Sequence, residues 1–406
     1  MDELTLAAID FGSKKISISL GKGNDEDIDI IGSYVRNSEG INKGIITDEE
    51  KCCQSLRELI KEVNNNLSNK LDKVYVGISS RNIRLVEATI RVNLYDGEVR
   101  RADIDSAIEK VKLDTILNDG EEIVDVVINF FNINDNVVRE NIIGQKANII
   151  SINFTILIGS SEELDKYKRI VTNCGLIIEG FVPNIFSGRK VFLNDKTSLG
   201  SKAIIDIGAG TSDIALFNHG ILKYISSVSL GGENISKDLS ICGKCTLSEA
   251  EKIKNIYSNT YETISKENDD INIGDTTVPT DLFYEVSKAR IEEIVEYINL
   301  ELKKSSFFEG ICSIIIYGDG INHYENVFLL IEKQFDKKVK VIDCNCLDMD
   351  NFSNISSLAI IKDMYDRLNL LYDYSIREEF KEEENYVKKH NEGIIGKLKN
   401  FLDEIF

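Results

Sequence analysis

The sequence predicts a two-lobed α/β protein in which one structural unit occurs twice. The chain has 406 residues, more than the roughly 250–300 at which a single hydrophobic core stops growing. Segments 4–20 and 202–217 share one pattern: an apolar strand, an aspartate, a glycine turn and a second strand. Because the two copies lie too far apart for a solenoid repeat, we expect two similar lobes that face each other.

The order of elements is the same in both halves. A third β-rich stretch follows at 28–35 and at 221–228, and a helix comes after each stretch. The first helix is expected from Thr47 to about Leu67, because Thr47 and Glu50 have the spacing of a capping box. Each half is therefore predicted to contain three strands and then a helix.

Both copies place an aspartate and a glycine turn at the end of their first strand. Glycine allows a phosphate to approach the backbone amides closely, and carboxylates can hold a hydrated Mg²⁺. The pair therefore predicts a clamp around a polyphosphate, with Asp10 and Asp206 holding Mg²⁺ through water. Two unrelated glycine turns are the alternative, which their matched pattern disfavours. The turn residues are Gly12, Ser13 and Lys14 in the first copy and Gly208, Ala209, Gly210, Thr211 and Ser212 in the second.

A third element is expected to complete the site. The strand 311–319 ends in Gly318-Asp319-Gly320, and a helix and a strand at 338–342 follow. The glycines would let the backbone lie against a flat base. A helix that starts at Ser248 carries Glu251 and Lys254 on one face, where they could contact the ribose and the base edge. A solvated ion pair is an equally weighted alternative for these two residues.

Composition excludes several classes of function. The formal net charge of −20 disfavours nucleic acid as a partner, because phosphate binding needs clustered Lys and Arg. No run of about 18 apolar residues is present that could span a bilayer, and the acidic N-terminus does not resemble a signal peptide. We therefore expect a cytoplasmic protein that is not integral to a membrane.

The cysteines allow two interpretations. Cys242 and Cys245, together with Cys344 and Cys346, have spacings that zinc ligands use. With three histidines and no secretion signal, reduced and mostly buried thiols are the preferred interpretation. The eight cysteines are Cys52, Cys53, Cys174, Cys242, Cys245, Cys312, Cys344 and Cys346.

The C-terminal residues predict a membrane-targeting helix. Residues 372–392 are expected to form a solvated charged linker, and 393–406 an amphipathic helix. At 1.5 Å per residue this helix is about 21 Å long, too short to cross a bilayer, so we expect it to lie among anionic headgroups. The alternative is that it folds back onto its own body. The apolar face consists of Ile394, Ile395, Leu398, Phe401, Leu402, Ile405 and Phe406.

Along nearly the whole chain these motifs resemble the actin, Hsp70 and sugar-kinase superfamily, and within it the FtsA family of bacterial cell-division proteins. The resemblance implies an α/β, two-lobed actin-like (ribonuclease H-like duplicated) ATPase fold with an FtsA-type inserted subdomain. The matching segments are IDFGSKK at 9–15, KGIITDEE at 43–50, VYVGISS at 74–80, DIGAGTSD at 206–213, GGENISKDLS at 231–240 and EAEKIK at 249–254.

The resemblance also implies ligands and roles. The ligand would be ATP with Mg²⁺. Catalytic roles are implied for Asp10, Asp206 and Asp213, with Asp10 and Asp206 holding the metal through water. The residues implied to bind the nucleotide are Gly12, Ser13, Lys14, Lys15, Gly208, Gly210, Thr211, Ser212, Gly231, Gly232, Glu251, Lys254, Gly318 and Gly320.

Partners and domains follow from the same resemblance. It implies self-association into filaments, contacts with anionic lipids and other divisome membrane proteins, and tethering of FtsZ through its C-terminal peptide at the cytoplasmic side of the membrane. A pilus adaptor similar to PilM and a small-molecule kinase remain alternatives. The expected domains are a first lobe at 1–81 with 161–200, an inserted subdomain at 82–160, a second lobe at 201–371, the linker at 372–392 and the helix at 393–406.

Three departures from the family pattern affect the expected activity. Asp319 stands in the loop where the family has more glycine, which places a negative side chain near the base and could weaken nucleotide binding. Val182-Pro183 stands where relatives usually have Glu-Pro, and that carboxylate could have oriented the attacking water. Ala209 replaces a glycine. Hydrolysis is therefore expected to be slow or absent.

Overall fold

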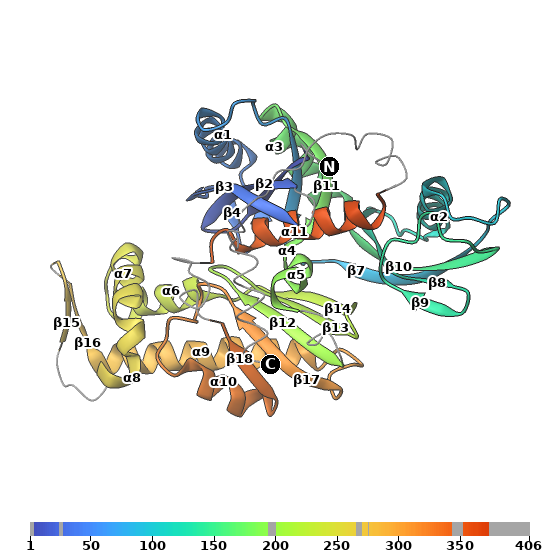
Figure 1. Cartoon of the computed structure of the whole chain (residues 1–406). Coiled ribbons are helices and arrows are strands. Elements are labelled where there is room, and N and C mark those ends of the chain that lie inside the picture. Colours follow the sequence, from blue (N-terminus) through green and yellow to red (C-terminus); the bar gives the residue numbers. More distant parts are fainter. Residues whose placement is uncertain are drawn as a thin grey trace, which may run out of the picture.

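The computed structural model describes residues 4–23, 27–193, 200–264, 270–274, 276–342 and 352–372. Within these ranges the chain forms two five-stranded sheets, one four-stranded sheet and two short hairpins. Figure 1 shows the two larger sheets one above the other, with the four-stranded sheet to one side.

The first sheet is built from five strands in the order β11-β6-β1-β2-β3. Strand β2 is antiparallel to β1 and β3, whereas β6 is parallel to β1 and β11. Helices α1 and α3 cover one face, and α4, α5 and α11 cover the other (Figure 1). The strands are β1 (Thr5–Phe11), β2 (Lys15–Gly23), β3 (Ile28–Asn37), β6 (Lys73–Ile78) and β11 (Ile177–Pro183). The helices are α1 (Glu49–Asn65), α3 (Ser161–Asn173), α4 (Asn184–Ser187), α5 (Arg189–Phe192) and α11 (Ile355–Leu370), and a hairpin joins β4 (Ile41–Asn42) and β5 (Ile45–Ile46).

The second sheet repeats this topology. Its order is β14-β13-β12-β17-β18, with two antiparallel pairings followed by two parallel ones. The predicted repeat of three strands and a helix is therefore confirmed. The strands are β12 (Ser201–Ile207), β13 (Ser212–Asn218), β14 (Ile221–Val228), β17 (Ile311–Tyr317) and β18 (Lys338–Val341). The other elements are α6 (Gly232–Cys242), α7 (Leu247–Tyr257), η1 (Ser258–Thr260), α8 (Tyr261–Ile264), β15 (Asp270–Ile273), β16 (Thr276–Pro279), α9 (Thr280–Leu302) and α10 (Val327–Phe335).

The four-stranded sheet is entirely antiparallel and has its own core. Its order is β7-β10-β8-β9, and helix α2 packs against it. We call this unit, residues 84–160, the inserted sheet. Its strands are β7 (Arg84–Asn93), β8 (Glu121–Ile133), β9 (Asn136–Val138) and β10 (Ile149–Ser160), and its helix is α2 (Arg101–Asp114).

The first helix begins one residue later than the sequence suggested. Asp48 is the N-cap, and its carboxylate accepts a hydrogen bond from Lys51 N at 3.1 Å. The expected capping role of Thr47 is wrong, because its hydroxyl donates to Gly40 O at 3.2 Å. The predicted capping box is therefore replaced by an aspartate cap, which serves the same free amides.

Candidate functional site

A cavity of about 360 Å³ lies between the two larger sheets, where the two glycine turns meet. The expected site residues line it, apart from Ser212 and Gly231. The lining includes Asp10, Gly12, Ser13, Lys14, Lys15, Asp206, Gly208, Gly210, Thr211, Asp213, Gly232, Glu251, Lys254, Gly318 and Gly320.

The two glycine turns have the same backbone geometry and touch each other. Gly12 N donates to Lys15 O at 3.0 Å, and Gly208 N donates to Thr211 O at 2.9 Å. A Cβ atom added to Gly210 would lie 2.9 Å from Ser13 Oγ. The repeated motifs therefore enclose one shared space, as the sequence predicted.

Three partly buried carboxylates lie at the base of this space. Asp10 and Asp206 hold equivalent places in β1 and β12, and Asp213 pairs with Asp206 across the second hairpin. Burial raises the pKa of Asp10 to about 7; Asn184 Nδ2, which donates to Asp10 Oδ1 at 2.7 Å, opposes the shift, and the charge of Asp213 adds to it. Burial, followed by the charges of Asp213 and Asp10, also raises the pKa of Asp206 well above its usual range. A cation would relieve this mutual repulsion.

The third glycine loop packs directly on the second turn. Gly320 N donates to Ile207 O at 2.8 Å, and Gly318 has a φ of +104°, a conformation that glycine adopts without strain. A Cβ atom on Gly232 would overlap Gly320 O. The backbone of this loop therefore forms one wall of the cavity, and a Cβ atom at Gly318 or Gly320 would clash with the end of β12 and the second turn.

A buried charge cluster closes the other side. Lys254 Nζ lies 3.0 Å from Glu251 and donates to Gly232 O at 3.1 Å, and Lys14 reaches across the cavity to Glu251. The side chain of Lys254 is 8% exposed, so the solvated-pair alternative is wrong. Burial would raise the pKa of Glu251, but Lys254, Lys14 and Ser236 outweigh it and lower the pKa to about 2.

Comparison of the sequence with known proteins finds relatives that share one name. A family model described as "Cell division protein FtsA" matches residues 203–359. The chain is 29% identical over 344 residues to the cell division protein FtsA of Neisseria meningitidis serogroup B, covering 82% of this chain and 83% of that protein. The chain is thus similar to cell division proteins of the FtsA family. It also matches FtsA of Bacillus subtilis at 25% identity, covering 87% of this chain and 82% of that one.

Solved structures show that this chain has the fold that the sequence predicted. A PilM–PilN type IV pilus biogenesis complex matches with a TM-score of 0.59 at 11% identity, covering 91% of this chain and 97% of that one. The ethanolamine utilization protein EutJ from Carboxydothermus hydrogenoformans matches with a TM-score of 0.52 at 15% identity, covering 89% and 90%. The two-lobed actin-like fold is thereby confirmed.

Asp319, the departure from the family's glycine loop, lines the cavity but has partners of its own. Its carboxylate accepts from Phe352 N at 3.1 Å and lies 3.9 Å from Lys15 Nζ. Burial acts to raise its pKa, but hydrogen bonds from His323 and Phe352 N and the charge of Lys15 lower it. The carboxylate thus joins the third loop to the segment before α11.

Two expected ligands lie behind the cavity wall. The hydroxyl of Ser212 donates to Leu230 O at 2.9 Å. Gly231 is the N-cap of α6, and its amide donates to Asn234 Oδ1 at 3.0 Å. Both residues support the turns that line the cavity.

Sequence reasoning missed several lining residues. Asn184 begins α4 immediately after β11; Phe352 and Ser353 come from the segment before α11, and Ser356 from its first turn. Asn184 follows a strand parallel to β6, so its position at the carboxyl edge of the sheet was a usable signal. Val182 is buried and is absent from the cavity lining.

The cysteine prediction is only partly correct. Cys52 and Cys53 are buried free thiols, and burial raises the pKa of Cys52 to about 12. Cys242 and Cys312 are exposed, so the expectation of burial is wrong for these two. Cys344 and Cys346 lie outside the described residues.

The seven expected membrane residues of 393–406 also lie outside the described residues. None of the described helices has the length and apolar character needed to cross a membrane.

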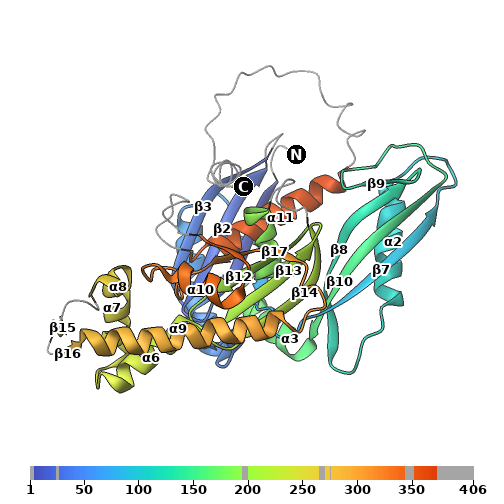
Figure 2. The ribbon, with the colours of Figure 1, turned by 90° about the horizontal axis from the view of Figure 1, so that it is seen from below.

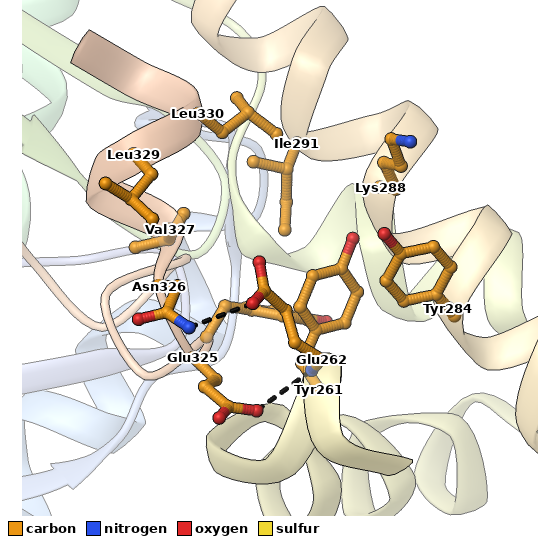
Figure 3. Close-up of a pocket in the computed structure, with 11 residues that line it drawn as sticks. Tyr261, Glu262, Tyr284, Lys288, Ile291, Glu325, Asn326, Val327, Leu329 and Leu330 are labelled. Carbon is orange, nitrogen blue, oxygen red and sulfur yellow. Dashed lines mark hydrogen bonds between the residues drawn. The ribbon is translucent and has the colours of Figure 1, made fainter. Parts of the chain in front are cut away.

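A second, smaller cavity of about 110 Å³ lies between helices α8, α9 and α10. Figure 3 shows its walls: Tyr261 of α8, Tyr284 and Lys288 of α9, and the apolar residues of α10. The rings of Tyr261 and Tyr284 stack with centroids 4.7 Å apart, and Leu329 at the rim is 53% exposed. The volume suits one large apolar side chain, since a ~150 Å³ cavity accommodates benzene.

Proposed function

We propose that this chain binds ATP with Mg²⁺ in the larger cavity and acts as an actin-like cell-division protein that polymerises on the inner face of the cytoplasmic membrane and tethers FtsZ filaments there. The observation that carries the nucleotide proposal is the contact between the two glycine turns above three partly buried carboxylates. Similarity to FtsA proteins supports the role in division.

The residues present fit a metal–nucleotide ligand. Backbone amides of Ser13, Gly210 and Thr211 would hold the phosphates from opposite sides. Among the described residues no group of three Asp, Glu, His or Cys side chains is close enough to bind a metal directly, which fits a Mg²⁺ held through water. When bound, that ion would supply positive charge between the buried carboxylates and the phosphates.

Weak hydrolysis is part of the proposal. In-line attack on a phosphate needs a positioned water, and β11 ends here in Val182-Pro183, with no carboxylate at that point. Asn184 uses its amide nitrogen on Asp10. We therefore propose that nucleotide binding has a structural role and that turnover is slow.

The nucleotide proposal is tested by equilibrium binding of ATP and Mg²⁺ to the full chain. The substitution Gly210→Ala places a Cβ 2.9 Å from Ser13 Oγ, and overpacking of this kind costs about 1–3 kcal/mol, or about tenfold in affinity. Gly180→Ala is the matched control, because its Cβ would lie at an ordinary 3.5 Å from Tyr75. No ATP binding by the wild-type chain would contradict the proposal.

Membrane attachment is proposed from the amphipathic pattern of 393–406. Each subunit of a filament would bring one such helix to the surface, so assembly would multiply a weak interaction. Deletion of 393–406 is expected to leave ATP binding unchanged and to abolish pelleting with anionic liposomes. If the truncated chain pellets as much as the full chain, residues 393–406 do not attach the protein to the membrane, and the proposed attachment is wrong.

The smaller cavity is the proposed contact for the FtsZ peptide. An apolar pocket with a polar rim is the usual setting for the residue that dominates a peptide interface, and this pocket lies apart from the nucleotide cavity. Leu329→Asp at the rim should weaken binding of an FtsZ C-terminal peptide about 30-fold, equivalent to about 2 kcal/mol. Ile256→Asp on α7 is the control, because that side chain is similarly exposed. Equal affinities for both variants would move the contact elsewhere.

A further inference from the structure

One helix, α11, reaches from the nucleotide cavity to the inserted sheet. Ser356 in its first turn and Ser353 just before it line the cavity, whereas Leu370 and Leu371 at its end pack against the core of the inserted sheet. Its 16 residues span about 24 Å. Figures 1 and 2 show α11 running from the middle of the molecule to the inserted sheet.

Between its ends, α11 is held by a buried chain of charges. Arg189 of α5 and Arg367 of α11 each lie 2.6 Å from Asp363, and Arg367 also lies 2.6 Å from Asp125 of β8. The side chain of Asp363 is fully buried. These contacts connect the first lobe, the helix and the inserted sheet in one continuous network.

A second connection runs from Asp10 to the same network. Asn184 donates to Asp10 and begins α4, and the guanidinium of Arg189, five residues later, stacks 3.6 Å above the ring of Phe186. A change at Asp10 thus reaches Asp363 through a short stretch of packed chain as well as through α11 itself.

The inserted sheet has a core of its own and a second apolar contact with the first lobe. Its separate core draws on residues 90–158, with Leu370 and Leu371 of the α11 end packed against it, whereas Val124, Val127 and Leu157 belong to the core of the first lobe. Polar contacts complete the junction: Arg101 donates to Leu371 O at 2.7 Å, and Lys168 lies 2.7 Å from Glu122. Arg367 Nε is buried and has no hydrogen-bond partner within the described ranges, so the junction is not fully satisfied in this arrangement.

We propose that α11 couples occupancy of the nucleotide cavity to the position of the inserted sheet, with the contact between Arg367 and Asp125 carrying the coupling. This inference rests on the proposed nucleotide site. A ligand that moves Ser353, Ser356 or Asp10 would shift α11, and α11 would move the inserted sheet because its last residues belong to that core. The physical basis is one rigid helix with both regions attached to it.

Hydrogen exchange of the full chain, measured with and without ATP and Mg²⁺, tests the coupling. In the wild type, exchange in β7 and β10 should change on binding by about fivefold. Asp125→Asn should keep ATP affinity within about twofold and lose that change, since Asp125 is remote from the cavity. Glu122→Gln is the matched control, because it removes a different ion pair between the same two regions.

The outcomes are separable. If the wild type binds ATP with no change in the inserted sheet, or if Asp125→Asn keeps the full change, the coupling is refuted and the nucleotide site stands. If the wild type binds no ATP, the proposed function is refuted and the coupling with it. Should Asp125→Asn fail to fold, Arg101→Ala, an exposed side chain that donates to the end of α11, should weaken the same change, and an unaltered change would refute the coupling.

Discussion

The buried carboxylate Asp363 provides the sharpest test of how the first lobe holds α11. One oxygen lies 2.6 Å from Arg189 and the other 2.6 Å from Arg367. The substitution Asp363→Asn keeps the shape of the side chain and removes its charge. Two guanidinium groups would then lie together in a buried setting with one fewer negative partner.

The cost follows from this geometry. Removing one partner of a buried ion pair typically costs about 3–5 kcal/mol, because the remaining charge is left unpaired. Asparagine keeps one oxygen that can still accept a hydrogen bond, and Asp125 still faces Arg367, so we expect about 3 kcal/mol. Asp366→Asn is the matched control on the same helix, because Asp366 is 30% exposed and pairs with Lys190 and Lys362. It should cost less than about 1 kcal/mol.

Urea unfolding followed by circular dichroism measures both variants, and pH adds a second readout. Burial acts to raise the pKa of Asp363, but the charges of Arg189 and Arg367 outweigh it and lower the pKa. A lowered pKa stabilises the fold above the unfolded-state value of roughly 4. The difference between wild type and Asp363→Asn should thus be constant from pH 8 to 6 and shrink only as the pH falls below about 4. Equal costs for Asp363→Asn and Asp366→Asn would refute the reasoning.

Three further predictions concern single positions. Asp48→Ala should cost about 1 kcal/mol in unfolding free energy through loss of the cap on α1, and Thr47→Ala should cost clearly less; a larger cost at Thr47 would restore the capping role assigned from sequence. Iodoacetamide at pH 8 should label Cys242 and spare Cys52, whose pKa burial raises to about 12; peptide mass spectrometry distinguishes the two. Lys254→Ala should weaken ATP binding about tenfold, since a hydrogen bond from a charged group contributes about 1.5–3 kcal/mol; unchanged affinity would remove Lys254 from the site.

Much of the larger cavity was predictable because its central residues belong to local patterns. A strand that ends in aspartate and turns on glycine has a period and a turn chemistry that are visible along the chain. The repeat of that pattern placed Asp10 and Asp206 at equivalent points of two equivalent sheets. The charged pair of Glu251 and Lys254 could be predicted for the same reason, because residues three positions apart lie on one face of a helix.

Other parts of the site depend on contacts between distant segments. Ser353 and Ser356 reach the cavity because α11 packs on the first sheet, and nothing in their local sequence distinguishes them from surface residues. The partners of Asp319 were likewise hidden, because Phe352 joins the third loop only after the chain has crossed back to the first lobe. Burial of Lys254 also depended on neighbouring elements that local spacing does not describe.

By itself, the sequence determined the two-lobed fold, the duplicated turns and the carboxylates between them, because periodicity and turn chemistry are local properties of the chain. The tertiary structure alone decided that the turns touch, which side chains complete the cavity, and that α11 joins the cavity to the inserted sheet. These are properties of packing, and packing depends on which surfaces meet in three dimensions.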